Sequence, residues 1–337
     1  MSELERRPMS RRALFRRGAL GLAGVAAASR ALTAAERSMP HGPHTPSNAA
    51  TRGMVGDASI DPLAFLETFD TGVVSRAVDG RVVREFEVTA VDRDIEVAPG
   101  VWYPAWTYNG QVPGPTLRAT EGDVVRVHFS NAGTHAHTIH FHGMHAARMD
   151  GVYEVVHPGE TFVYEFQARP FGLHLYHCHA VPLKRHIAKG LYGAFLVDPK
   201  TPRPPAREMV MVLNGFDTNF DAENEIYAVN TVPFAYHHQP ITVRRGELQR
   251  IYMVNLLEFD LLNSMHLHGN LFHVYRTGTK LVPDEFTDTI MFCQGERHIL
   301  EFSYDEEGPF MFHAHQSEFA ELGWMGVFNV VPGAPAV

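Results

Sequence analysis

The two halves of this 337-residue chain repeat the same series of short segments at matching spacing. "HFHG" at His140–Gly143 corresponds to "HLHG" at His266–Gly269, and "GETFVYEF" from Gly159 corresponds to "GERHILEF" from Gly295. Thirteen residues after the last two starts come "GLHLYHCH" and "GPFMFHAH". Matching spacing over several segments predicts two domains that share one fold.

The segments between the repeats have the pattern of strands. Runs such as "REFEVTAV", "DVVRVHFSN", "TFVYEFQ" and "EMVMVLNG" are separated by turn residues, and no long amphipathic helix appears. The pattern predicts an all-β chain of two β-sandwich domains. The proline-rich stretch "DPKTPRPPARE" (Asp198–Glu208) places the boundary between them, so that the domains span residues 84–200 and 201–337.

The N-terminal residues have the pattern of a targeting signal. Arg11 and Arg12 precede an apolar run from Gly18 to Ala28, and small residues suited to cleavage follow. Residues 1–35 are therefore predicted to be a twin-arginine-type signal peptide, which implies a periplasmic or extracellular protein. Residues 36–83 are predicted to be a linker and N-terminal extension.

Composition excludes some partners and draws attention to histidine. The formal net charge of −9 argues against nucleic acid as a partner. The chain has 21 histidines but only two cysteines, Cys178 and Cys293. Cys293 lies in the apolar stretch "TIMFCQG" and is predicted to be a buried, inert thiol.

Strand geometry divides the histidines between two faces, because successive side chains of a strand point to opposite sides. In "HCH", His177 and His179 are expected to face one way and Cys178 the other. In "HTIHFHG", His140 and His142 share a face, and His137 lies on the opposite one.

The face with the cysteine predicts a copper site for electron transfer. A thiolate and two imidazoles with a weak or absent axial group form the trigonal set that suits this role. The predicted ligands are His137, Cys178 and His186, with a non-coordinating Leu191 at the axial position. The second repeat has Asn263 and Ala314 at the first two of these positions, so only the first domain is predicted to hold such a site.

The other face predicts a metal cluster. Its four H-x-H pairs could together hold copper ions with open positions for dioxygen. These eight residues are His140, His142, His177, His179, His266, His268, His313 and His315. Asp150 and Glu318 are candidates for proton delivery or orientation, and an equally good interpretation makes them surface or turn carboxylates.

From about Arg84 to Val331 the sequence resembles a laccase-like, two-domain multicopper oxidase. The resemblance rests on the H-x-H pairs, the cysteine inside one of them, and "TYNGQVPGPTLRATEGD" (Thr107–Asp123). It implies two cupredoxin-like Greek-key domains and about four copper ions per chain. It also implies oxidation of a substrate at a type 1 copper, electron transfer through Cys178 to its flanking histidines, and reduction of dioxygen to water. Relatives of this kind are homotrimers whose clusters form between subunits.

The resemblance also assigns each ligand to a type of copper. Type 1 corresponds to His137, Cys178 and His186, type 2 to His140 and His266, and type 3 to His142, His177, His179, His268, His313 and His315.

Two other functions stay open. The insertion "AVPLKR" between Cys178 and His186 resembles copper nitrite reductases, but that family has an aspartate at the position of His140 and lacks a histidine at that of His179. The other function, of a different class, is a non-catalytic copper-binding or electron-carrier protein.

The reducing substrate is predicted from the residues around His186. The cations Lys184, Arg185 and Lys189 disfavour a metal ion as substrate. A phenol, an aromatic amine or a protein electron donor is therefore expected.

Overall fold

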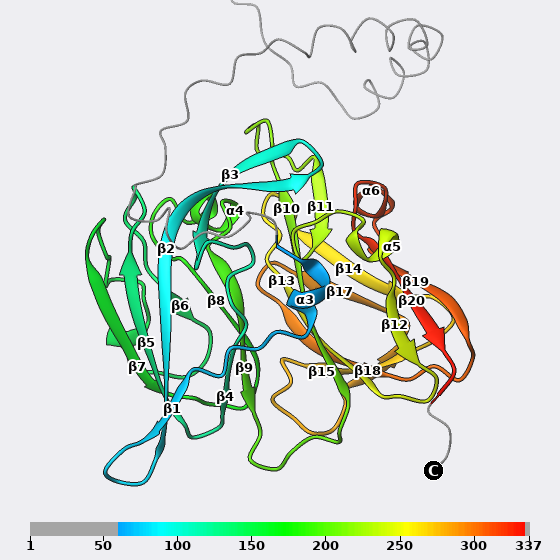
Figure 1. Cartoon of the computed structure of the whole chain (residues 1–337), viewed down its shortest axis with the longest axis horizontal. Coiled ribbons are helices and arrows are strands. Elements are labelled where there is room, and N and C mark those ends of the chain that lie inside the picture. The colour runs from blue at the N-terminus through cyan, green and yellow to red at the C-terminus, as the bar shows by residue number, and fades with distance from the viewer. Residues whose placement is uncertain (1–59, 334–337) are drawn as a thin grey trace, which may run out of the picture. The chain divides into compact units, whose positions relative to one another are not determined.

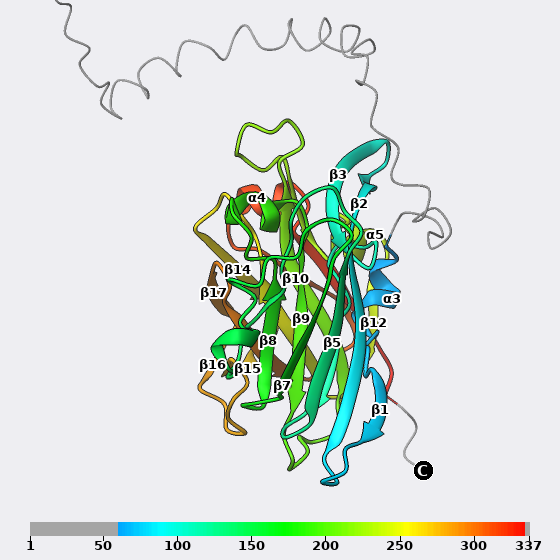
Figure 2. The same cartoon turned by 90° about the vertical axis from the view of Figure 1, so that its left-hand side faces the viewer.

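The computed structural model describes residues 60–333, all of which belong to one compact unit, residues 47–337. Figures 1 and 2 show these residues as curled sheets with short helices at their edges. The prediction of an all-β, cupredoxin-like fold is confirmed. None of the helices in the described part has the length and apolar character needed to cross a membrane.

The first half of the described chain forms two sheets. One has the order β1-β2-β5-β7, with β3 paired to β2, and the other has the order β4-β9-β8-β6. The strands of the first sheet are β1 (Val73–Arg76), β2 (Val82–Ala98), β3 (Val101–Tyr108), β5 (Val124–Asn131) and β7 (Thr161–Gln167). Those of the second are β4 (Leu117–Thr120), β6 (His140–Phe141), β8 (Gly172–His177) and β9 (Tyr192–Asp198).

The second half forms two further sheets, with the orders β11-β10-β13-β18-β15-β16 and β12-β20-β19-β14-β17. The former contains β10 (Arg207–Phe216), β11 (Ile226–Val229), β13 (Gln249–Asn255), β15 (Phe272–Arg276), β16 (Glu285–Thr287) and β18 (Arg297–Phe302). The latter contains β12 (Ile241–Arg244), β14 (Leu262–Leu267), β17 (Thr289–Cys293), β19 (Gly308–His313) and β20 (Met325–Val331).

Short helices cover the ends of the sheets. They are α3 (Pro62–Leu66), the 3₁₀ helix η3 (Ala147–Met149), α4 (Leu183–Ala188), α5 (Ala235–His238) and α6 (Ser317–Glu321). The helices α4 and α6 occupy equivalent places in the two halves. Each lies in the chain between an H-x-H pair and the next strand, which is β9 after α4 and β20 after α6.

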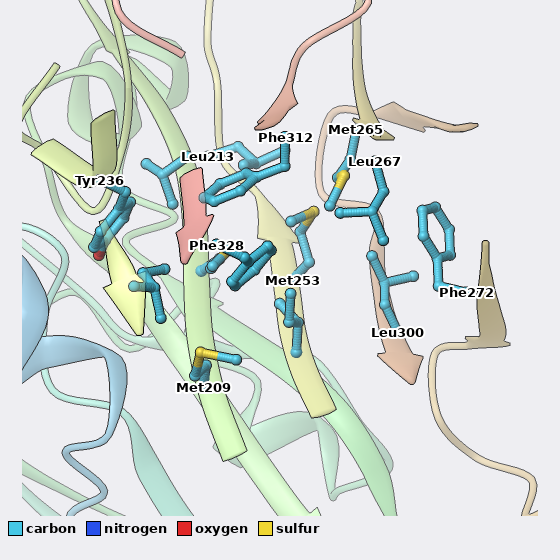
Figure 3. Close-up of a cluster of buried hydrophobic side chains, with 14 of the residues drawn as sticks. Met209, Leu213, Tyr236, Met253, Met265, Leu267, Phe272, Leu300, Phe312 and Phe328 are labelled. Atoms are coloured by element: carbon cyan, nitrogen blue, oxygen red, sulfur yellow. The ribbon is translucent and has the colours of Figure 1, made fainter. Parts of the chain in front are cut away.

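Each half has its own apolar core. In the first, alternation along β5 and β7 turns Phe129 and Tyr164 inward, and both are fully buried. In the second, Phe312 of β19 and Phe328 of β20 lie 4.6 Å apart between ring centroids. Figure 3 shows these two rings beside Met253 of the facing sheet. Burial of these faces is the main term that stabilises each sandwich.

The repeat seen in the sequence appears as the same strand register in both halves. The paired residues are His140 with His177 and Phe141 with Tyr176 in the first half, and His266 with His313 and Leu267 with Phe312 in the second. The central residues of "HCH" and "HAH" also form the same type of backbone hydrogen bond. Cys178 N–H donates to the Leu191 carbonyl at 2.9 Å, and Ala314 N–H donates to the Trp324 carbonyl at 3.2 Å.

The described part of the predicted N-terminal extension, residues 60–83, contains regular structure. The Asp61 carboxylate caps α3 by accepting the N–H groups of Leu63 and Ala64 at 3.0 and 3.2 Å. Strand β1 pairs antiparallel with β2. The Tyr236 hydroxyl of the second half donates to the carbonyl of Pro62 at 2.9 Å, so this segment contacts both halves. The predicted signal peptide, residues 1–35, lies outside the described residues.

The two halves are joined by buried and half-buried charges. Arg118 of β4 donates to Asp198 of β9 at 2.8 Å and to Glu208 of β10 at 2.7 Å. Glu208 also accepts from Arg250 at 3.2 Å, and Arg250 donates to Glu301 at 2.6 Å. Because Glu208 binds an arginine from each half, it fixes one sandwich against the other.

The prediction for Cys293 is wrong. Strand β17 alternates, so that Ile290 and Phe292 face the core while Met291 and Cys293 face outward. The apolar surroundings of Cys293 in the sequence did not reveal its side of the strand, and its thiol is exposed.

Candidate metal centre

Three buried side chains of the first domain meet around one point. Cys178 follows β8 directly, His186 lies in α4, and His137 precedes β6. The two imidazole Nδ1 atoms are 3.2 Å apart, and Cys178 Sγ lies 3.3 Å from His186 Nδ1 and 3.9 Å from His137 Nδ1. The triangle is small enough for one ion to reach all three atoms at ordinary metal–ligand lengths of about 2.0–2.3 Å. We call these three residues the sulfur group.

The electrostatics of the sulfur group suit a cation. Burial lowers the pKa of His137 to about 3 and that of His186 to about 4, so both imidazoles are neutral at neutral pH and have lone pairs to offer. Burial raises the pKa of the Cys178 thiol, so a metal ion would have to displace its proton. Two neutral imidazoles and one thiol form the donor set of a copper electron-transfer site.

The neighbours of the sulfur group restrict its ligands. Leu191 is fully buried and carries no donor atom, so it cannot coordinate a metal. The indole of Trp106 lies 4.8 Å from the His186 ring and 5.5 Å from the His137 ring, measured between centroids. Sequence reasoning missed Trp106, because nothing in "YPAWTY" indicates that this ring, rather than a neighbouring one, reaches the site.

The histidines on either side of Cys178 belong to a second group. His140, His142 and His177 offer nitrogen atoms within 4.8 Å of one another, and the ring of His179 lies 5.5 Å from that of His140. We call these four the first imidazole group. The flanking rings thus meet the H-x-H pair of β6, while Cys178 Sγ meets His137 and His186.

Backbone carbonyl groups orient the rings of the first imidazole group. His140 Nδ1–H donates to the Asp150 carbonyl at 2.7 Å, and His177 Nδ1–H donates to the Cys178 carbonyl at 2.9 Å. The Nε2 atom of His177 therefore carries a lone pair, and it lies 3.2 Å from His142 Nε2. Burial lowers the pKa of His142 to about 2 and that of His177 to about 4, which leaves both rings neutral. Two neutral rings that face each other in this way fit a shared metal ion or proton.

The turn after Asp150 depends on a glycine. Gly151 has a φ of +71°, and a Cβ atom there would lie 1.9 Å from the carbonyl oxygen of Ile139. A side chain would therefore displace the Asp150 carbonyl that orients His140.

The second domain carries an equivalent group, His266, His268, His313 and His315, which we call the second imidazole group. His268 Nε2 lies 2.9 Å from His313 Nε2, and the rings of His266 and His315 are 5.5 Å apart. His313 Nδ1–H donates to the Ala314 carbonyl at 2.6 Å, as His177 does to Cys178 in the first domain. Within residues 60–333, no ring of this group contacts a ring of the first imidazole group.

Among its described residues the second domain has no sulfur group, and a tryptophan takes the position of Leu191. Trp324 stands where the first domain has Leu191, and it is fully buried beside Ala314. Its indole N–H donates to Asn263 Oδ1 at 3.0 Å, and Asn263 takes the position of His137. A hydrogen bond between the indole of Trp324 and the amide of Asn263 thus stands where the first domain has metal-ligand side chains.

The two candidate carboxylates differ in placement. Asp150 lies in the site, because its Oδ1 is 3.2 Å from His140 Nδ1 in addition to the carbonyl contact. Glu318 is exposed in the first turn of α6, and its carboxylate has no hydrogen bond or ion pair among the described residues. The structure therefore places only Asp150 against a histidine of the predicted set.

Comparison with known proteins identifies the relatives of this architecture. Two family models described as multicopper oxidase match residues 90–202 and 202–334. A solved structure described as a multicopper oxidase is 56% identical, with a TM-score of 0.80 over 81% of this chain and 98% of the other.

Copper-containing nitrite reductases are also similar. One from Neisseria meningitidis serogroup A is 30% identical over 68% of this chain and 64% of its own length, so this chain spans less than two thirds of that relative. The structure of a copper nitrite reductase from Nitrosomonas europaea is 28% identical, with a TM-score of 0.68 over 74% of this chain and 94% of that one.

Proposed function

Because the chain belongs to the multicopper oxidase family, we propose that it is a copper-dependent, laccase-like oxidase that uses dioxygen as electron acceptor. One observation supports this most strongly. Cys178 belongs to the sulfur group, and its neighbours His177 and His179 belong to the first imidazole group. One short peptide segment therefore links two sites and would give electrons a covalent path from one to the other.

The donor atoms indicate how the sites divide the reaction. His137, Cys178 and His186 would hold a type 1 copper, and the two imidazole groups would hold type 2 and type 3 copper, about four ions in all. Bound there, copper would supply one-electron oxidation at the sulfur group and reduction of dioxygen at the imidazole groups. In balance, four substrate molecules each give up one electron and one proton, and one dioxygen takes all of them to form two waters.

The chain's own residues prepare these sites. Burial keeps the imidazoles of the sulfur group neutral and excludes water from Cys178. The backbone carbonyls of Asp150 and Cys178 accept hydrogen bonds from Nδ1–H of His140 and His177. The Nε2 atoms of these two rings are therefore left to bind a metal ion. The carboxylate of Asp150, close to His140, would hold a proton on the way to reduced oxygen. We assign the same role to Glu318 only in an assembly, because among the described residues its carboxylate forms no ion pair with a histidine.

The imidazole groups also support a proposal about assembly. In the part of the chain that the structure describes, the first and second groups do not touch, and His268 and His315 are exposed. We therefore propose a homotrimer in which the first group of one subunit meets the second group of the next, in a closed head-to-tail ring. Export by the predicted signal would place this particle in the periplasm or outside the cell.

A nitrite reductase is the second candidate, and the similarity to such enzymes favours it. A reductase needs one catalytic copper rather than a cluster. The contact of His179 with His140 argues for the cluster, because it brings all four histidines of the first imidazole group together.

Oxygen consumption separates the candidates. Copper-loaded protein is supplied with 2,6-dimethoxyphenol on an oxygen electrode, and separately with nitrite and a reductant under argon. We expect one dioxygen consumed for every four phenols and no nitrite turnover. His142→Ala should abolish oxygen uptake, whereas His273→Ala, at an exposed position on β15, should retain it. Nitrite turnover without oxygen uptake would favour the reductase, and copper binding with neither activity would favour a carrier.

A further inference from the structure

A cavity of about 610 Å³ lies against α4, the helix that carries His186, and has no role in the chemistry above. Its walls come from both halves of the chain: α4 and Tyr103 on one side, and the β10–β11 loop with Phe259 on the other. Figure 1 shows α4 and this loop at the same end of the sheets. The volume falls in the range of about 300–1,000 Å³ that holds one small organic molecule.

Two phenylalanines of this cavity have an unusual backbone conformation. Phe220 and Phe259 have φ values of +65° and +73°, in the left-handed region that bulky residues rarely occupy. Phe220 is also 59% exposed, so burial in the core does not account for its position. Strained residues tend to persist where they serve a site, and here both present an aromatic ring to the same space.

The cavity is also rich in positive charge. The Lys189 ammonium lies 4.4 Å from the Phe220 ring centroid, and the Lys184 ammonium lies 4.5 Å from that of Phe259. The one acidic residue in the lining, Asp217, is buried and accepts the backbone N–H groups of Asp221 and Ala222 at 3.1 and 2.8 Å. Asp217 also interacts with the Lys189 ammonium, and the lining still holds three cationic side chains against this one carboxylate.

The side of the cavity formed by α4 is also the side nearest the sulfur group. Lys184 and Arg185 immediately precede His186 in α4. The guanidinium of Arg185 lies 5.1 Å from the Trp106 ring, which contacts His186. A ring held in the cavity would therefore lie near Arg185, which contacts Trp106, and Trp106 in turn contacts His186.

We propose that this cavity binds the reducing substrate and selects aromatic compounds that carry a carboxylate. Tyr103, Phe220 and Phe259 offer ring faces for the aromatic body, and Lys184 and Lys189 attract the anion. This inference rests on the proposed oxidase function, since it names the donor for that reaction. It also predicts binding that is measurable without turnover.

Calorimetry with a matched pair of ligands tests the selectivity. Full-length, copper-loaded protein is titrated with 4-methoxybenzoate and with 4-methoxybenzyl alcohol, which share a ring and lack a phenolic hydroxyl. We expect the carboxylate to bind more tightly and to weaken as salt is raised. Equal affinity for the two ligands, or no binding of the carboxylate, would overturn the inference.

Variants of Lys184 identify where the anion binds. Lys184→Gln should weaken binding of 4-methoxybenzoate about two- to fivefold, the scale of one exposed ion pair. Lys184→Arg keeps the charge and should restore affinity. Lys200→Gln makes the same charge change beyond the far end of β9 and should bind as wild type does. A loss as large in Lys200→Gln, or none in Lys184→Gln, would place the anion elsewhere, for instance on copper, and would refute the proposal.

Turnover separates this inference from the proposed function. With 4-hydroxy-3,5-dimethoxybenzoate and 2,6-dimethoxyphenol as donors, we expect a lower KM for the carboxylate, and Lys184→Gln should shrink that difference. Oxygen uptake with equal KM values would overturn the cavity proposal and leave the oxidase standing. Carboxylate binding that depends on Lys184, without oxygen uptake from any donor, would support the cavity proposal and refute the oxidase function.

Discussion

Replacement of Trp324 tests whether its indole packs in the part of the second domain that corresponds to the sulfur group of the first. The indole is fully buried and fills the space that Leu191 and the sulfur group occupy in the first domain. Truncation of a buried tryptophan to alanine costs about 3–5 kcal/mol of unfolding free energy, through lost burial and the cavity left behind. Asn263 Oδ1 would also lose the indole donor, but it keeps the Ser264 N–H at 2.8 Å, so this adds about 1 kcal/mol at most. For Trp324→Ala we therefore expect a total loss of about 3–6 kcal/mol, a large part of a typical stability of about 5–15 kcal/mol.

Urea unfolding of the copper-free protein, followed by far-UV circular dichroism, measures this loss without a contribution from metal binding. Trp324→Phe, which keeps most of the packing but not the N–H donor, should lose about 1–2 kcal/mol. Trp102→Ala is the matched control, because Trp102 is 56% exposed and its loss should change stability by less than about 0.5 kcal/mol. A shift for Trp324→Ala no larger than that of the control would refute the packing argument.

Three further predictions concern acid, buried charge and the turn at Gly151. Burial lowers the pKa of several histidines in the folded state, so the unfolded chain binds more protons below about pH 6.5, and the melting temperature of copper-free protein should fall as the pH drops from 7.5 to 5. Burial lowers the pKa of His142 to about 2, that of His137 to about 3, and those of His177, His186 and His298 to about 4. Glu301→Ala leaves the buried Arg250 without its 2.6 Å partner and should lower the unfolding free energy by about 3 kcal/mol in urea titrations. Gly151→Ala should reduce the copper content found by metal analysis, because its Cβ would meet the Ile139 carbonyl; full copper content would contradict this.

The alternation of side chains along strands made most of the fold and of the site predictable from the sequence. Because side chains alternate, the order of His177, Cys178 and His179 was enough to place the sulfur and the rings in different groups. The prediction for Cys293 failed because it rested on the apolar stretch around this residue, and such a stretch does not say which of its residues face the core.

Other parts of the site could not be predicted because they depend on contacts between distant segments. Trp106 is about 80 residues from His186 in the sequence, and only the packed sandwich brings the rings together. The left-handed Phe220 and Phe259 belong to loops of the second half, yet they complete a cavity against α4 of the first. Their backbone conformation leaves no mark in a single sequence.

The absorption and electron paramagnetic resonance spectra of copper-loaded Cys178→Ser test the central claim most directly. If Cys178 holds one copper while its neighbours hold others, the substitution should remove the intense blue absorption and about one copper ion per chain, and the signal of the imidazole-bound copper should persist. A blue band that survives the substitution, or loss of all copper together, would contradict the division into two centres.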